Sequence, residues 1–299
     1  MGAESQVWAG NCTHVTAATA YRTALERLRF QPNPSVRSVV IKVNICEYRT
    51  PETGAITDPL LLGALLGELR RVFPASGLTI IENDATTLEM GSAFRLLGFS
   101  ELAARFHATL LNAAGGEWVE VEVPGGRVFE KLEIPAAVHS ADLLVNLAKL
   151  KTNALTILTG CLKNTFGLLR LKRKVSLHGR IDDVLVDINK VIRPGLCIVD
   201  GVVGMEGVGG PAFGRPKRCD LLIAGRNPVA VDACAARVMG FRPLSIRHIR
   251  LCHQAGLGPV DYELSTDITG FDYRRYRFRF DRLEYTLRNL VRSRAGAAT

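Results

Sequence analysis

Four polar side chains lie within an otherwise apolar stretch of the chain, AKLKTNALTILTGCLKNTFG at residues 148–167; they are Lys149, Lys151, Lys163 and Asn164. Residues 141–147 (ADLLVNL), just before it, have the continuous apolar pattern of a strand buried in a sheet. Because a chain leaving such a strand normally arrives at the ligand-binding edge of an α/β fold, the lysines are candidates for contacts with an anion. A single lysine more often reaches solvent along its apolar stem, but three lysines and an asparagine within sixteen residues favour a site.

Other polar side chains follow predicted strands or begin predicted helices, where an anionic group is readily held. The residues that we predict to bind the substrate are Lys42, Asn44, Asp58, Asp84, Asn164 and Asp232. Asp58 also has a purely structural interpretation, as the cap of the predicted helix 60–72.

The segment DGVVGMEGVGGP at 200–211 combines five glycines with Asp200 and Glu206. Glycines allow the backbone to pass close to a ligand. The segment lacks the Gly-Lys-Ser/Thr of a phosphate-binding loop and the helix spacing of a dinucleotide-binding fingerprint, so a flexible surface turn explains it about equally well.

Several lysines with a few acids are typical of a site that holds an anion and moves a proton. The residues that we predict to be catalytic are Lys149, Lys151, Lys163, His178, Asp200 and Glu206. The lysines would bind and polarise the anion, while the histidine or an acid would exchange protons. The six histidines have neither HxxxH nor HExxH spacing, so we assign no metal ligands, although magnesium bound through Asp200 and Glu206 stays open.

Seven dispersed cysteines without any CxxC pair argue against a disulfide framework, a zinc ribbon or an iron-sulfur cluster. We predict that most of them are buried thiols. The sequence indicates no particular cofactor.

The length of 299 residues and the 47% hydrophobic content fit one large α/β domain, which we place at 1–270. We predict a mixed, mostly parallel sheet flanked by helices, with a β-hairpin insertion at 118–134. The predicted strands of the sheet are 36–43, 78–81, 141–147, 196–199 and 220–224, and the predicted helices are 17–30, 60–72, 91–97, 101–107, 182–192, 228–239 and 246–255. No apolar run reaches the ~18–20 residues of a membrane span and residues 1–10 do not resemble a signal peptide, so we predict a cytoplasmic location.

A basic C-terminal arm follows at 271–299, with eight arginines against three acids. Basic and aromatic residues together can bind nucleic acid or an anionic membrane, but packing on the chain's own domain or on a second subunit is the commoner outcome. We predict packing, with Tyr276, Phe278 and Phe280 on one side of a strand and Leu283, Leu287 and Leu290 buried.

The motifs together resemble the domain-of-unknown-function family numbered 362. The residues that carry the resemblance span about 37–257 and include IKVN, TDP, DLLVNLAKLKT, LTGCLKNTFG, His178, IVDGVVGMEGVGGPAFG and NPVAVDACAARVMG. The resemblance implies an α/β domain that is often encoded beside, or fused to, ferredoxin-type iron-sulfur modules, and this chain has no cluster-binding cysteine module. Asn153 stands where many relatives have a histidine, which removes a candidate acid-base or metal-binding group.

These observations favour an enzyme that acts on a small anionic, carboxylate-bearing metabolite by acid-base proton transfer, as in an isomerisation, racemisation, elimination or decarboxylation of a biosynthetic pathway. Two alternatives are a ferredoxin-linked reductase component and a non-enzymatic accessory protein that docks through the arm. The partners to consider are the metabolite, a second copy of the chain and an external ferredoxin, whereas nucleic acid and membranes are disfavoured.

Overall fold

A mixed β-sheet forms the centre of the protein. The computed structural model describes residues 2–170, 174–281 and 283–287. Within them the strand order is β11-β1-β10-β9-β7-β2-β3-β4, and β8 pairs with β7. The strands are β1 (Gln6–Asn11), β2 (Ser38–Lys42), β3 (Gly77–Glu82), β4 (Thr109–Asn112), β7 (Leu143–Asn153), β8 (Ile157–Leu158), β9 (Leu196–Glu206), β10 (Arg215–Gly225) and β11 (Glu263–Thr266). Neighbours from β9 to β4 are parallel, whereas β10 is antiparallel to β9 and β1, which confirms the predicted mixed, mostly parallel sheet.

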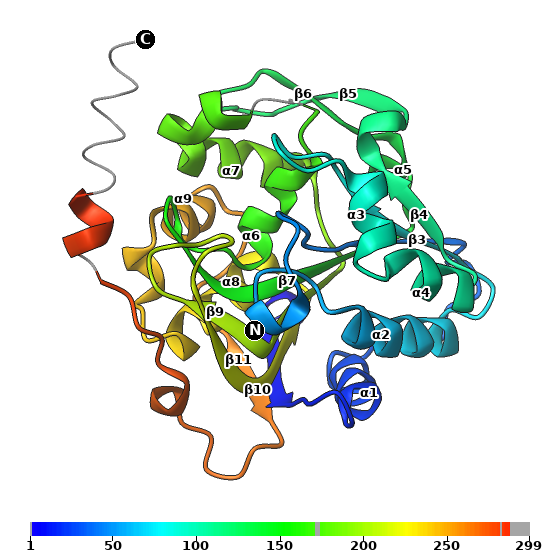
Figure 1. Cartoon of the computed structure of the whole chain (residues 1–299), viewed down its shortest axis with the longest axis horizontal. Helices are drawn as coiled ribbons and strands as arrows, with labels where there is room; N and C mark the ends of the chain where they lie inside the picture. The colour runs from blue at the N-terminus through cyan, green and yellow to red at the C-terminus, as the bar shows by residue number, and fades with distance from the viewer. Residues whose placement is uncertain (1, 171–173, 282, 288–299) are drawn as a thin grey trace.

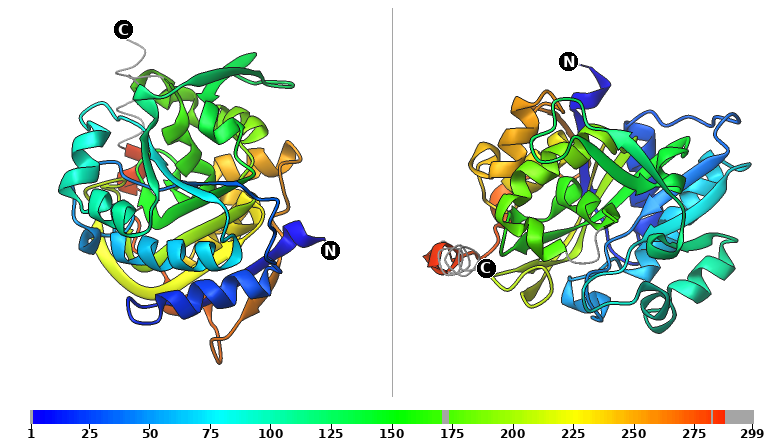
Figure 2. Two further views of the ribbon diagram at one scale, coloured as in Figure 1. Left: turned by 90° about the vertical axis from the view of Figure 1, so that its right-hand side faces the viewer. Right: turned by 90° about the horizontal axis from the view of Figure 1, so that it is seen from above.

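Helices cover both faces of this sheet (Figures 1 and 2). They are α1 (Ala17–Arg27), α2 (Pro59–Val72), α3 (Met90–Leu96), α4 (Phe99–Arg105), α5 (Ala136–His139), α6 (Gly160–Asn164), α7 (Ile181–Val191), α8 (Pro228–Val238) and α9 (Arg247–Gln254). Helices α1 to α4 share one hydrophobic cluster with the sheet. Helices α6 to α9 pack on the opposite face. The fold is therefore an α/β arrangement of three layers.

The alternation of side chains along each strand explains the two cores. In β2, Val39 and Ile41 contact the cluster of α1 and α2, while Val40 between them contacts the cluster of α7. Successive side chains of a strand point to opposite faces, so a strand between two helical layers has to be apolar throughout. This is why the buried strands could be recognised as short continuous apolar runs.

The two strands at the centre of the sheet are longer than predicted. Strand β7 continues to Asn153 and β9 continues to Glu206, although their sequences become polar or glycine-rich after the first few residues. Their far ends are held by pairing with neighbours: Lys151 pairs with Met205, and Glu206 pairs with Arg215 of β10. The predicted loop at 200–211 is therefore mostly strand, and the connecting loop is 207–214.

Besides the two-residue β8, three short strands of the sheet, β1, β4 and β11, were not predicted. Each has only four to six residues, and β4 and β11 lie at the two edges of the sheet. Their pairing partners decide their structure, because runs this short have no distinctive period of their own.

The predicted hairpin insertion is present as β5 (Trp118–Glu122) and β6 (Lys131–Pro135), an antiparallel pair outside the main sheet. It covers part of the α7 face through Leu132 and Ile134.

The C-terminal arm differs from the prediction in its details. Phe278 is buried and the Phe280 ring packs edge-on against Phe241, but residues 276–280 form no strand. The prediction of buried leucines was wrong for Leu283 and Leu287, which are 70% and 54% exposed within a short helical turn, and Leu290 lies outside the described residues. Aromatic side chains, rather than the leucines, attach the described part of the arm to the domain.

Among the described residues, the structure has no helix that is both long and apolar enough to cross a membrane.

Candidate functional site

A pocket of about 280 Å³, here called the candidate pocket, opens at the carboxyl ends of β2, β3 and β7. The chain runs from β2 to β3 on one side and later returns to β7 on the other side of β2. The pocket therefore lies at a topological switch point, where open α/β sheets usually bind their ligands. Its polar lining includes four lysines, Lys42, Lys151, Lys163 and Lys174, and the acids Glu82 and Asp84.

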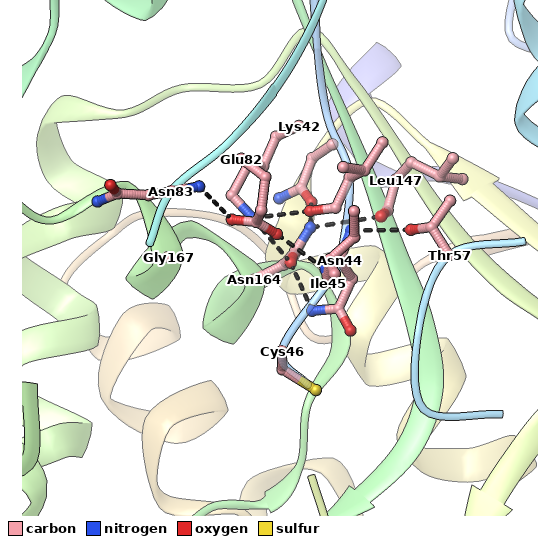
Figure 3. A network of polar contacts seen from close by, with 12 residues as sticks. Lys42, Asn44, Ile45, Cys46, Thr57, Glu82, Asn83, Leu147, Asn164 and Gly167 are labelled. Atoms are coloured by element: carbon pink, nitrogen blue, oxygen red, sulfur yellow. Dashed lines mark hydrogen bonds and ion pairs between the residues drawn. The ribbon is translucent and has the colours of Figure 1, made fainter. Parts of the chain in front are cut away.

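A hydrogen-bonded network forms the floor of the candidate pocket (Figure 3). Lys42 and Glu82 are the last residues of neighbouring strands, and their side chains form a buried ion pair with Nζ 2.8 Å from Oε1. Lys42 Nζ also donates to Asn164 Oδ1 at 3.3 Å. The Glu82 carboxylate accepts two backbone N–H groups as well, from Ile45 at 2.9 Å and Asn83 at 3.0 Å. This acid is thus fully occupied by groups of the protein.

Asn164 joins this network to Lys151. The Asn164 side chain accepts from Asn44 Nδ2 at 2.8 Å and donates to Asn146 Oδ1 at 2.8 Å. Lys151, which is 0% exposed, donates to Asn44 Oδ1 at 2.7 Å. Its other acceptors are Ala55 O at 2.6 Å, Pro211 O at 3.2 Å and Cys46 Sγ at 3.4 Å. Burial lowers the pKa of Lys151, while the neighbouring Cys46 and Glu82 act in the opposite direction.

Lys163 and Lys174 contribute the remaining ammonium groups of the lining. Burial lowers the pKa of each to about 8; neighbouring lysines lower the pKa of Lys163 further, whereas Glu82 acts in the opposite direction on Lys174. Lys174 donates to Gly167 O at 2.7 Å. Lys163 Nζ lies 5.3 Å from the centroid of the Phe166 ring, and no residue of the described chain hydrogen-bonds to it or forms an ion pair with it.

The structure brings seven of the predicted site residues to the candidate pocket: Lys42, Asn44, Asp84, Lys151, Lys163, Asn164 and His178. Asp84 accepts from Met90 N at 2.8 Å and Asn112 Nδ2 at 2.9 Å. His178 lies with its ring 6.4 Å from that of Phe166. Whether these residues bind or catalyse stays a prediction.

The other five predicted site residues lie outside the candidate pocket: Lys149, Asp200, Glu206, Asp58 and Asp232. The side chains of Lys149 and Asp200 form a fully buried ion pair at 2.7 Å. Glu206 accepts from Arg279 N at 2.9 Å. Asp58 caps α2 through Leu60 N and contacts His14 Nε2 at 2.6 Å.

Asp232 is the most instructive of the five, because its buried carboxylate caps α6. It accepts from the backbone N–H groups of Cys161 at 2.6 Å and Leu162 at 2.9 Å. Gly160 has a φ of +56°, and a Cβ there would collide with the carboxylate. Asp232 therefore positions the turn that carries Lys163 and Asn164 into the pocket.

We expect Asp232→Ala to destabilise the protein by about 2–6 kcal/mol, because two buried N–H donors at ~1–3 kcal/mol each would lose their acceptor. Asp232→Asn keeps one acceptor and should cost less. Burial raises the pKa of Asp232 to about 7, so the wild-type stability contribution of this group falls as the pH rises towards 7. Denaturant unfolding between pH 5 and 8 measures both effects, and an unchanged stability of the alanine variant would disprove the capping role.

The pocket lining also contains residues that were not predicted as site residues, among them Glu82, Asn83, Lys174 and Cys46. Glu82 and Asn83 directly precede Asp84 at the same strand exit, so the polar run at 82–84 was the available signal. Lys174 lies in a basic segment in which no sequence pattern distinguishes it from its neighbours. The only feature that could have indicated Cys46 is its position two residues after Asn44.

The chain belongs to the family described as domain of unknown function (DUF362), which matches residues 39–237. A curated relative, the thylakoid-associated protein sll1697 of Synechocystis sp., is 32% identical over 254 residues, which are 82% of this chain and 76% of the relative. The apoprotein structure of lactate racemase from Thermoanaerobacterium thermosaccharolyticum is similar over 80% of this chain and 58% of that one, with 14% identity and a TM-score of 0.40. That likeness is too low to carry a functional argument.

Proposed function

We propose that this protein is an enzyme that binds a small carboxylate-bearing metabolite in the candidate pocket and transfers a proton to or from it. Isomerisation, racemisation, elimination and decarboxylation all contain such a step. We also propose that the protein acts in the cytoplasm, as predicted from the sequence.

The observation that carries the proposal is an excess of ammonium groups in the pocket. Within the described residues, Glu82 pairs with Lys42, but no carboxylate lies within 4.0 Å of the ammonium groups of Lys151, Lys163 or Lys174. Bringing like charges together in a partly buried site is costly unless a negative charge joins them. A bound anion supplies that charge.

The volume of the pocket favours a small ligand. At about 280 Å³ it is at or below the ~300–1,000 Å³ typical of sites for drug-sized molecules. The amide groups of Asn44 and Asn164 already bond to the protein, so the ligand's carboxylate would be held mainly by the lysines.

Lys163 is the best placed group for the proton transfer. A pKa of about 8 leaves both its protonated and neutral forms populated near neutral pH, as a general acid-base catalyst requires. Lys174 would hold the anion beside it, and Lys151, whose protons are donated to protein acceptors, would contribute positive charge without direct contact. His178 and Asp84 line the same pocket and are the alternative proton carriers.

The experiment that tests the proposal is solvent deuterium exchange. The purified protein is incubated in D₂O with a set of small carboxylic acids, including 2-hydroxy, 2-amino and unsaturated acids, and NMR follows loss of carbon-bound protons. We expect at least one acid to exchange with the wild type and not with Lys163→Met. Absence of both exchange and calorimetric binding across the set would overturn the proposal.

The pH dependence of binding should report the same lysines. The lowered pKa values mean that Lys163 and Lys174 lose their charge as the pH rises through about 8, so affinity for an anion should fall between pH 7 and 9. The contribution of these lysines to the stability of the fold changes in the opposite direction. Between about pH 8 and the ordinary lysine pKa, the folded protein binds fewer protons than the unfolded chain, so its stability rises with pH. Calorimetric titrations at several pH values measure the first effect, and a flat affinity profile would contradict it.

A further inference from the structure

The candidate pocket contains a thiol that the proposed proton transfer does not use. Cys46 is partly exposed and lines the pocket. Its Sγ lies 3.4 Å from Lys151 Nζ and 3.6 Å from each of the carbonyl oxygens of Ala55 and Pro211. The thiol is thus placed beside a buried ammonium group, at a position that a ligand can reach.

Two ammonium groups act on the Cys46 sulfur. Lys151 Nζ donates to the sulfur at 3.4 Å and also to three oxygens, and although burial lowers the pKa of Lys151, the neighbouring Cys46 acts in the opposite direction and favours the ammonium form. Lys163 is a second positive charge that interacts with Cys46. Glu47, the next residue, opposes them, but its carboxylate accepts a hydrogen bond from Tyr48 N at 3.1 Å. Thiols that lie among cations are in general more reactive nucleophiles than isolated ones.

Most of the other cysteines lie in surroundings that disfavour the thiolate. Burial raises the pKa of Cys12, Cys234 and Cys252 to about 12 and that of Cys219 to about 11, and it also raises that of Cys161. Cys219 is partly exposed like Cys46 but does not line the candidate pocket. It is therefore an internal control for the reactivity of Cys46.

We propose that Cys46 is a nucleophile of this pocket and that the substrates are small α,β-unsaturated carboxylic acids. This inference rests on the proposed function and specifies its substrate class. The lysines hold the carboxylate, which places the neighbouring carbon-carbon double bond within the pocket that the sulfur lines.

The reaction balances without any further reactant. The Cys46 thiolate forms a carbon-sulfur bond to the β carbon, the π bond breaks, and its electron pair at the α carbon takes a proton from the Lys163 ammonium. Rotation about the resulting single bond is free. In the reverse step neutral Lys163 removes an α proton, the double bond forms again and the thiolate leaves, so that a cis acid becomes its trans isomer.

The direct test uses maleate and fumarate as probes. Mass spectrometry of the protein after incubation should find one added acid on Cys46, and NMR should detect conversion of maleate to fumarate. We expect Cys46→Ser to abolish both, whereas Cys219→Ser leaves both unchanged. Conversion that survives in Cys46→Ser, or the absence of both adduct and conversion in the wild type, would overturn the inference.

A second test measures thiol reactivity without relying on a substrate. Iodoacetamide should label Cys46 at least ~10-fold faster than Cys219 at pH 7.5, because reactivity follows the thiolate fraction and burial suppresses the thiolate of Cys219. Lys151→Gln should slow labelling of Cys46, because it removes a neighbouring positive charge. If that variant does not fold, Lys163→Met should slow the labelling for the same reason. Equal labelling of the two cysteines would overturn the inference.

The two proposals fail in different ways. If saturated acids bind and exchange protons through Lys163 while Cys46 is inert, the thiol inference is wrong and the proposed function stands. If calorimetry finds no binding of saturated or unsaturated acids, the proposed function itself is wrong.

Discussion

Lys163→Met should reduce ligand affinity by about 10–100-fold and turnover by ~10²–10⁴-fold, while the melting temperature stays unchanged or rises. A charged hydrogen bond to a bound anion contributes about 1.5–3 kcal/mol, and a positioned acid-base group contributes the larger kinetic factor. Stability should not fall, because the Lys163 ammonium has no hydrogen-bond partner in the described part of the chain and lies near other lysines. Calorimetry, the deuterium exchange assay and thermal unfolding measure the three quantities.

Lys217→Met is the matched control for this variant. Lys217 also lies over a phenylalanine ring, 5.7 Å from the centroid of Phe278, and does not line the candidate pocket. We expect it to leave affinity and turnover unchanged. A loss of several kcal/mol of stability in Lys163→Met would show instead that Lys163 has a structural role.

Lys149→Met should destabilise the protein by about 3–5 kcal/mol, because it leaves the Asp200 carboxylate buried without its partner. Asp200→Asn should have a similar effect, since the Lys149 ammonium then lacks a counter-charge. The double variant should lose much less than the sum, because no unpaired charge remains and the amide oxygen introduced at position 200 can still accept the hydrogen bond from Val202 N.

Denaturant unfolding of the wild type, the two single variants and the double variant measures the coupling energy. Additive losses would mean that the two side chains do not interact, contrary to the 2.7 Å contact. A stable Lys149→Met protein that had lost ligand binding would restore Lys149 to the functional site.

The sequence by itself determined the fold class and one part of the site. Strands that are buried on both faces are apolar throughout, and helices are amphipathic, so these elements and the mixed, mostly parallel sheet could be recognised from local pattern. Polar residues at or just after the ends of such strands, including Lys42, Asn44 and Asp84, then had to lie at one edge of the sheet. The same local argument placed Lys151, Lys163 and Asn164 near them.

Only the tertiary structure decided which of the polar residues meet. Pairing with β9 places Lys149 opposite Asp200, with which it forms an ion pair inside the core, and after a shift in register Lys151, two residues later, lines the candidate pocket. Asp232 is polar and follows a strand in the sequence, but the packing of α8 against α6 turns it into a cap. The contact between Cys46 and Lys151 joins residues 105 apart in the chain, and no local pattern contains a distance of that kind.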